Sequence, residues 1–204
     1  MPLAGYLVVH LLSQASAFGG PLAYAARVGS SPSLFSLVLE VGLVYVPLLV
    51  HVSLGAWRVA YGEGEAPREG AASEHLSIAT LQRVSALVLL LFLLSHIWQF
   101  RVRVWTSVIT PSDYYAELCA SLSSTWWGGV PLVAIGYLLG TAAAALHGAL
   151  GLYRAGLTLR WVGEGRQRLW GRCCAALAVS LFGLGALIVI DLATGSVLIH
   201  LRGS

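Results

Sequence analysis

The sequence has 204 residues, of which 57% are hydrophobic and only 10% are charged, and its mean hydropathy is +0.79. A soluble domain of this length carries about a quarter charged residues, so this composition excludes an ordinary soluble domain and indicates a membrane protein. All twelve basic residues are arginine and they form no basic run. No nucleic-acid partner is therefore expected.

The apolar runs predict an all-α membrane protein with five membrane-spanning helices in one domain, residues 1–204. A hydrocarbon core of roughly 30 Å requires about 20 helical residues. The runs that meet or approach this length are approximately residues 3–18, 34–57, 79–100, 130–152 and 173–193. The first is short, but it has no positive n-region and carries a histidine, so it is interpreted as a retained span and not as a signal peptide.

The segments between these runs are predicted loops, and one of them contains a further helix. Gly, Pro and Ser punctuate residues 19–33, and residues 61–75 are polar and charged. The sequence PSDYYAEL, residues 111–118, favours a short interfacial helix ahead of the membrane boundary marked by Trp126 and Trp127. Asp191, near the end of the last span, is expected to be interfacial.

The arginines predict the orientation of the spans. Loops on one side carry eight arginines and the opposite side carries four, so the positive-inside rule places the N-terminus in the cytoplasm and the C-terminus outside. The first group is Arg58, Arg68, Arg83, Arg154, Arg160, Arg166, Arg168 and Arg172, and the second is Arg27, Arg101, Arg103 and Arg202.

Four of the six histidines lie inside predicted spans, one in each of the first four. With this orientation, His10 and His96 lie toward the outer leaflet, and His51 and His147 lie toward the cytoplasmic leaflet. A haem held between two helices needs one neutral imidazole from each helix at the same depth, and the pattern supplies this twice. Hydrogen bonds between helices would explain a single such histidine equally well. A zinc site is a weaker alternative, because it needs three or four converging ligands.

Other residues on the same helix faces favour a large planar cofactor. Arg58, Arg103 and Arg154 each follow a candidate ligand by seven residues and are candidates to bind haem propionates, as is Arg83 at the cytoplasmic start of the third span. Arginines that snorkel from helix ends are the alternative. Gly136 and Gly140 precede His147 on its face, where they leave room either for a macrocycle or for close packing of a second helix.

Glu40 is the exceptional acid of the second span. It precedes His51 by eleven residues, which places it about 16 Å away along the same face, near the level of the outer histidines. Acids in membranes are costly and usually functional, so Glu40 is a candidate for handling protons, with a solvated interfacial glutamate as the alternative.

Three segments resemble a known family. They are LEVGLVYVPLLVHVSLGAW, residues 39–57, LQRVSALVLLLFLLSHIWQFR, residues 81–101, and ALHGALGLYRAGLTLRW, residues 145–161. Together they resemble the single-chain, di-haem cytochrome b anchor (type B) of succinate:quinone oxidoreductases, the succinate dehydrogenases and fumarate reductases. The resemblance covers nearly the whole chain, and the LQRV...SHxW pattern is its most specific part.

The resemblance implies a bundle of the first four helices around two b haems, with the fifth helix packed beside it. Iron ligands would be His10 with His96 for the outer haem and His51 with His147 for the inner haem. The subunit would anchor a flavoprotein with FAD and an iron–sulfur protein on the cytoplasmic face of the bacterial cytoplasmic membrane. It would pass electrons from the iron–sulfur clusters to a quinone, commonly menaquinone, near Glu40, while partner subunits oxidise succinate.

Two departures from the family pattern bear on function. The family usually has a cytoplasmic arm before its first helix, and here that arm is nearly absent. Some fumarate-reducing members carry a glutamate near the inner ligand of the fourth helix, where this chain has AAALHGAL, so succinate oxidation is favoured. The alternatives are a di-haem anchor of another dehydrogenase, such as a hydrogenase or formate dehydrogenase, and a haem-free membrane anchor or small transporter.

Overall fold

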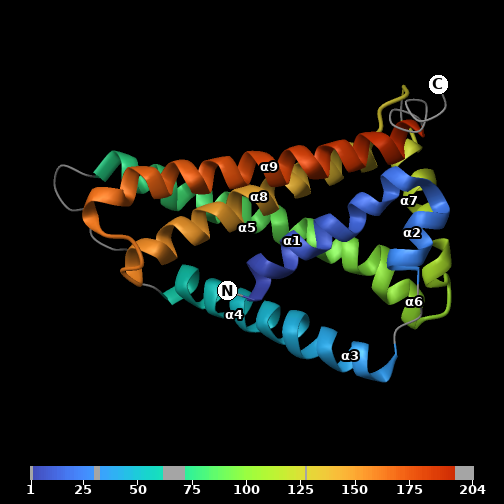
Figure 1. The fold of residues 1–204 in the computed structure, drawn as a ribbon, viewed down its shortest axis with the longest axis horizontal. Coiled ribbons are helices and arrows are strands. Elements are labelled where there is room, and N and C mark those ends of the chain that lie inside the picture. The colour runs from blue at the N-terminus through green and yellow to red at the C-terminus, as the bar shows by residue number, and fades with distance from the viewer. Residues whose placement is uncertain (1, 30–32, 62–71, 127, 196–204) are drawn as a thin grey trace.

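The computed structural model describes residues 2–29, 33–61, 72–126 and 128–195, and these ranges are almost entirely helical (Figure 1). The only β pairing among them is an isolated antiparallel bridge between Trp126 and Val130. In chain order the elements are α1 Pro2–Gln14, η1 Ala15–Gly19, α2 Gly20–Val28, α3 Leu34–Glu40, η2 Val41–Tyr45, α4 Val46–Tyr61, α5 Ala72–Ile97, η3 Trp98–Val102, α6 Arg103–Trp105, η4 Pro111–Asp113, α7 Tyr114–Ser123, α8 Leu132–Thr158, η5 Glu164–Arg166 and α9 Gln167–Thr194.

Four predicted spans are confirmed as helices long and apolar enough to cross a membrane. Within the described residues these helices run over Leu37–Tyr61, Ile78–Trp105, Leu132–Thr158 and Glu164–Thr194. The first two each contain a π-helical segment, η2 and η3. Each helix satisfies its own backbone hydrogen bonds, which is the requirement that a hydrocarbon environment imposes on a spanning segment.

The predicted span at residues 3–18 is not confirmed. Helix α1 has 13 residues, which corresponds to about 20 Å at 1.5 Å per residue and falls short of the bilayer core. The short 3₁₀ helix η1 extends it to Gly19, and Gly20, with φ of 81°, turns the chain into α2. A fifth span therefore stays a prediction.

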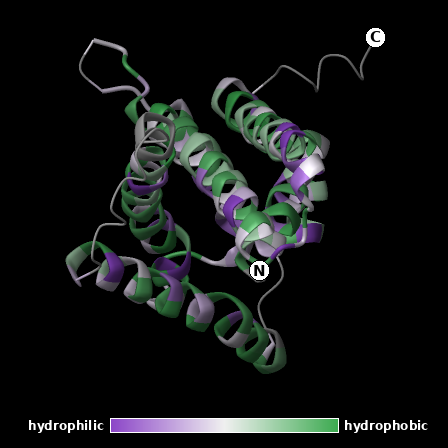
Figure 2. Ribbon diagram, turned by 90° about the vertical axis from the view of Figure 1, so that its left-hand side faces the viewer, coloured by the Kyte–Doolittle hydropathy of each residue, from purple (hydrophilic) through white to green (hydrophobic). Residues whose placement is uncertain are grey.

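Helix α8 is the centre of the packing, with α5 on one side and α9 on the other (Figure 1). The continuous helix from α3 to α4 diverges from this group and meets α1. In its most apolar 18-residue window no residue is buried. Apolar residues predominate along the helix (Figure 2), and many of them are exposed. The predicted bundle of the first four spans is not established by these contacts and stays a prediction.

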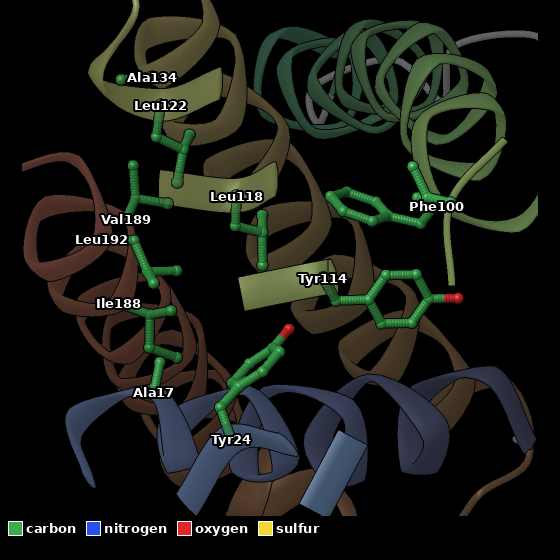
Figure 3. Packing of buried hydrophobic residues seen from close by; sticks show 11 residues of the cluster. Ala17, Tyr24, Phe100, Tyr114, Leu118, Leu122, Ala134, Ile188, Val189 and Leu192 are labelled. Carbon is green, nitrogen blue, oxygen red and sulfur yellow. The ribbon is translucent and has the colours of Figure 1, made fainter. Parts of the chain in front are cut away.

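The buried hydrophobic cluster lies at the end of the molecule that carries α7 (Figure 3). The helix predicted at PSDYYAEL is present there as η4 and α7. Its start is fixed by Thr110, whose backbone N–H donates to Asp113 Oδ2 over 2.7 Å. This hydrogen bond and the one from the Thr110 side chain lower the pKa of the Asp113 carboxyl. Leu118 and Leu122 of α7 belong to the same buried cluster as Ile188, Val189 and Leu192 of α9.

The expected interfacial position of Asp191 stays a prediction, but the residue is buried within the protein. It is 4% exposed, and α7 packs against α9, which hydropathy along one span does not reveal. Its Oδ1 atom has no hydrogen-bond partner among the described residues. The pKa of the Cys119 thiol in α7 is raised above its ordinary value. Desolvation of the thiol raises this pKa, and the charge of Asp191 raises it further.

Close helix packing explains one of the two glycines placed on the His147 face. A Cβ at Gly140 would come within 2.2 Å of the Phe92 side chain, whereas a Cβ at Gly136 would meet nothing within 4 Å. Gly140 therefore lets α5 approach α8, and Gly136 is not needed for this contact.

We expect Gly140→Ala to destabilise the protein by about 1–3 kcal/mol, the usual cost of overpacking a filled contact. Gly136→Ala is the matched control on the same helix, and it should be neutral or slightly stabilising because alanine favours helix. Thermal unfolding of the purified protein in detergent measures both. Adding Phe92→Leu to Gly140→Ala should recover part of the loss, and equal stability of the two glycine variants would contradict the packing assignment.

Candidate functional site

The four intramembrane histidines form two pairs, each between different helices. His10 of α1 lies beside His96 of α5, with ring centres 5.9 Å apart and ring planes at 89°. His51 of α4 lies beside His147 of α8, again with ring centres 5.9 Å apart, and with planes at 81°. The structure thus brings together the same partners that the sequence placed at equal depth.

The spacing within each pair fits two axial ligands of one iron. Two imidazoles on opposite sides of a metal ion place their ring centres about 6 Å apart, because each metal–nitrogen bond is about 2 Å and each nitrogen lies about 1 Å from its ring centre. Among the described residues no three or more histidine, cysteine or acidic side chains converge on one point. A pair of histidines therefore fits a haem, which supplies four nitrogens of its own, better than a bare metal ion.

The Nδ1 atom of His147 faces helix α5 and meets the main chain. It lies 3.3 Å from the main-chain carbonyl oxygen of Gln82, an acceptor, and also 3.3 Å from the side-chain Nε2 of Gln82, a donor. Ser85 donates to the same carbonyl over 3.1 Å and lies 3.5 Å from Nδ1. These contacts orient the ring through Nδ1, so Nε2 would be the nitrogen that binds an iron.

Aromatic rings enclose the pair formed by His10 and His96. Phe92 stacks on His96 with ring centres 5.4 Å apart, and Phe100 lies 5.2 Å from it at a tilt. On the other side Tyr6 stacks on His10 at 5.5 Å. Tyr137 completes the surroundings, with its hydroxyl oxygen 3.3 Å from His96 Nδ1. These rings restrict the orientation of both imidazoles.

Glu40 is paired with a cation. Its carboxylate accepts hydrogen bonds from both Nε and Nη2 of Arg101, the first over 2.7 Å. The hydroxyl of Tyr45 donates to Glu40 Oε1 over 3.2 Å. The side chains of Glu40 and Arg101 are 16% and 25% exposed. This bidentate pair ties α3 to η3.

Both partners of this ion pair adjoin π-helical segments. Glu40 immediately precedes η2, and Arg101 lies within η3. A π turn inserts an extra residue into the helical repeat and is found frequently at functional sites. Here the wider turns occur in the two segments that face each other through Glu40 and Arg101.

The four predicted propionate arginines have different surroundings. Arg58 lines a hollow of about 440 Å³ on α4 that also includes His51 and Trp57. Arg83 and Arg154 are exposed. Arg103 instead binds Glu117 of α7, with Nη1 to Oε2 at 2.7 Å and Nη2 to Oε1 at 3.3 Å. Propionate binding by these arginines stays a prediction.

The sequence is similar to the succinate dehydrogenase cytochrome b558 subunit of Bacillus subtilis (strain 168). The chain is its distant relative. The two are 23% identical over 159 residues, which is 78% of this chain and 73% of the Bacillus subunit. No model of a protein family matches the chain, and no solved structure matches it significantly.

Sequence reasoning missed the residues that hold the candidate ligands and the acid. Arg101 was considered only as one of the arginines that predict the orientation of the spans in the membrane, although it lies five residues beyond His96. Gln82, Gln99 and Tyr137 were not singled out at all. Glutamine inside a span is uncommon, so the two glutamines were a usable signal, whereas one tyrosine among eight was not.

We expect the Glu40–Arg101 pair to contribute about 1–3 kcal/mol of coupling energy, between the values typical of exposed and buried pairs. The measurement is a double-mutant cycle of Glu40→Gln and Arg101→Gln on unfolding in detergent. Glu117→Gln with Arg103→Gln is the matched control cycle, and it should give a smaller coupling because that pair is more exposed. Strict additivity of the Glu40 and Arg101 substitutions would refute this role.

Proposed function

We propose that this chain is the membrane-anchoring, di-haem cytochrome b subunit of a succinate dehydrogenase. The observation that carries the proposal is the presence of two histidine pairs, each drawn from two helices and each spaced for one iron. The similarity to a succinate dehydrogenase cytochrome b558 subunit supports the same role. Four long apolar helices support its place in a membrane.

Two b haems are the proposed resident cofactors. His10 and His96 would hold the outer haem, and His51 and His147 the inner haem. Each haem, when bound, supplies a centre that gains and loses one electron. The chain contributes the ligands, an apolar aromatic enclosure and a fixed imidazole orientation, while Arg58, Arg83, Arg103 and Arg154 are the candidates for contacts with propionates.

Glu40 is the proposed proton-handling residue of a quinone site, with menaquinone as the expected quinone. Reduction of a quinone to a quinol consumes two protons, so an acidic side chain beside the site that relays protons would assist it. Arg101 holds the carboxylate in place, and the Tyr45 hydroxyl supplies a hydrogen on Glu40 Oε1. This arrangement presents a charged acid within an apolar helix.

The proposed setting follows from the arginine distribution and the similarity. The N-terminus would face the cytoplasm and the C-terminus the outside of a bacterial cytoplasmic membrane. The arginine-rich turns would face the flavoprotein and iron–sulfur subunits, which carry the FAD and the iron–sulfur clusters. Succinate would be oxidised on those subunits, and the chemistry of this chain would be limited to electron transfer and quinone reduction.

The reduced absorption spectrum with haem stoichiometry tests the proposal. We expect two b haems per chain. His51→Ala and His147→Ala should each remove the same spectral component, and His10→Ala and His96→Ala should each remove the other, because both imidazoles of a pair are needed to hold one iron.

The possible results separate the competing functions. Absence of a b-type band in the purified chain would eliminate the haem proposal and favour a haem-free anchor. Loss of the same component in His51→Ala and His96→Ala would show that the pairs are wrongly assigned. Co-purification with a nickel or molybdenum protein, in place of a flavoprotein, would identify a different dehydrogenase.

We expect Glu40→Gln to slow quinone reduction by about 10²-fold or more while both haems stay bound, since general acid–base groups contribute about 10²–10⁴-fold. Succinate-driven reduction of a menaquinone analogue by the complex measures this rate. Glu117→Gln, which removes the other paired acid of this region, is the control and should leave the rate near the wild-type value. Unchanged quinone kinetics in Glu40→Gln would assign the residue a structural role only.

A further inference from the structure

A chain of hydrogen bonds leads from His96 to helix α7. The Tyr137 hydroxyl oxygen lies 3.3 Å from His96 Nδ1, and the same hydroxyl donates to Gln99 Oε1 over 2.8 Å. Gln99 Nε2 in turn donates to Ser121 Oγ over 2.9 Å. Four elements, α5, α8, η3 and α7, are thereby joined by three side-chain contacts.

The donors and acceptors of this chain determine which nitrogen of His96 carries the proton. Gln99 uses its amide nitrogen on Ser121, so its carbonyl oxygen faces Tyr137 and can only accept. The single hydrogen of the Tyr137 hydroxyl is therefore used on Gln99. What Tyr137 offers His96 is a lone pair, so Nδ1 of His96 must be the donor and Nε2 keeps its lone pair.

The aromatic rings packed around His96 leave the Tyr137 hydroxyl as the polar partner of its imidazole. Phe92 packs edge-on against Tyr137, with ring centres 5.2 Å apart, and also stacks on His96. Phe100, which is 8% exposed, covers the adjoining side of the His96 ring. Apolar rings thus surround the contact between Tyr137 and His96, and an apolar surrounding strengthens such a contact relative to one in water.

His147 is also oriented through its Nδ1, but by a different kind of residue. That atom lies 3.3 Å both from the main-chain carbonyl oxygen of Gln82 and from the Gln82 side-chain Nε2, whereas Nδ1 of His96 meets a tyrosine hydroxyl. In each pair the histidine on α5 or α8 is therefore held through Nδ1 by a polar group of the other helix. The recurrence of this feature in both pairs indicates that the contact serves the ligand and is not incidental packing.

We propose that Tyr137, oriented by Gln99, is a positioning residue that keeps the proton of His96 on Nδ1 and thereby sets the reduction potential of the outer haem. This inference rests on the proposed function. An acceptor at Nδ1 makes the imidazole a more electron-rich ligand, which favours the oxidised, more positively charged iron. The hydroxyl therefore lowers the potential of one haem and leaves the other unaffected.

The test is a redox titration of the intact complex carrying Tyr137→Phe, followed by the spectra of the two haems. At a fixed potential we expect the reduced-to-oxidised ratio of the outer haem to rise about threefold to tenfold, which is about 30–60 mV at 59 mV per tenfold for one electron. The inner haem should keep its potential. Tyr153→Phe, on the same helix α8 but away from this chain of hydrogen bonds, is the matched control. It should leave the reduction potentials of both haems unchanged.

A second variant covers the case in which Tyr137→Phe fails to assemble. Gln99→Leu removes the acceptor that orients the Tyr137 hydroxyl, so it should shift the reduction potential of the outer haem alone. If this variant assembles and the potential of the outer haem is unchanged, the proposal is overturned. Loss of only the outer haem in either variant supports positioning of His96. If Tyr137→Phe binds two haems and both keep their wild-type potentials, this inference alone is overturned. If the wild-type chain binds no haem, the proposed function is overturned and this inference with it.

Discussion

The interior of a bilayer offers no water to a polar side chain, so a polar group in these helices is stabilised when it finds a partner on another helix. Glu40 with Arg101 and His51 with His147 are such contacts, whereas Asp191 Oδ1 has no hydrogen-bond partner among the described residues. In the most apolar window of the α3–α4 helix no residue is buried. The polar and aromatic contacts of Glu40 and His51 therefore contribute to placing this helix.

The two ends of the molecule are stabilised in different ways. At the α7 end, apolar residues of α7, α8 and α9 form a buried cluster around Leu122. Away from that end, α5 and α8 meet through the close approach of Phe92 to Gly140 and through the contacts of His147. The pair of His10 and His96 adjoins the buried cluster through Phe100 and Tyr137, whereas Gln82 and Ser85, which contact His147, lie outside it.

The sequence predicted the histidine pairs because a polar residue in an apolar span stands out and its depth can be counted along the helix. Four of the spans could also be predicted from the sequence, since hydropathy over about 20 residues depends on no tertiary contact. Tyr137 and Arg101 could not be assigned in this way. Their partners depend on how each helix is rotated and on the extra residue of each π segment, and neither quantity is encoded in hydropathy.

Asp191 shows a limit of the same reasoning. Its position near a span end suggested an interfacial residue, and hydropathy along one span did not reveal that α7 packs against α9 and that Asp191 is 4% exposed. The run at residues 3–18 has the composition of a span, but its α-helix ends at Gln14 and its 3₁₀ extension at Gly19, so its crossing of the membrane stays a prediction.

The contrast between the two Nδ1 contacts has a consequence for sequence variation. Beside His147 the contact is shared between a peptide carbonyl, which every amino acid at position 82 would supply, and the side chain of Gln82. Beside His96 the contact is a phenol, which depends on one codon. A single substitution can therefore remove the whole Nδ1 contact of the outer site, whereas a substitution of Gln82 would leave the main-chain part of the inner one in place.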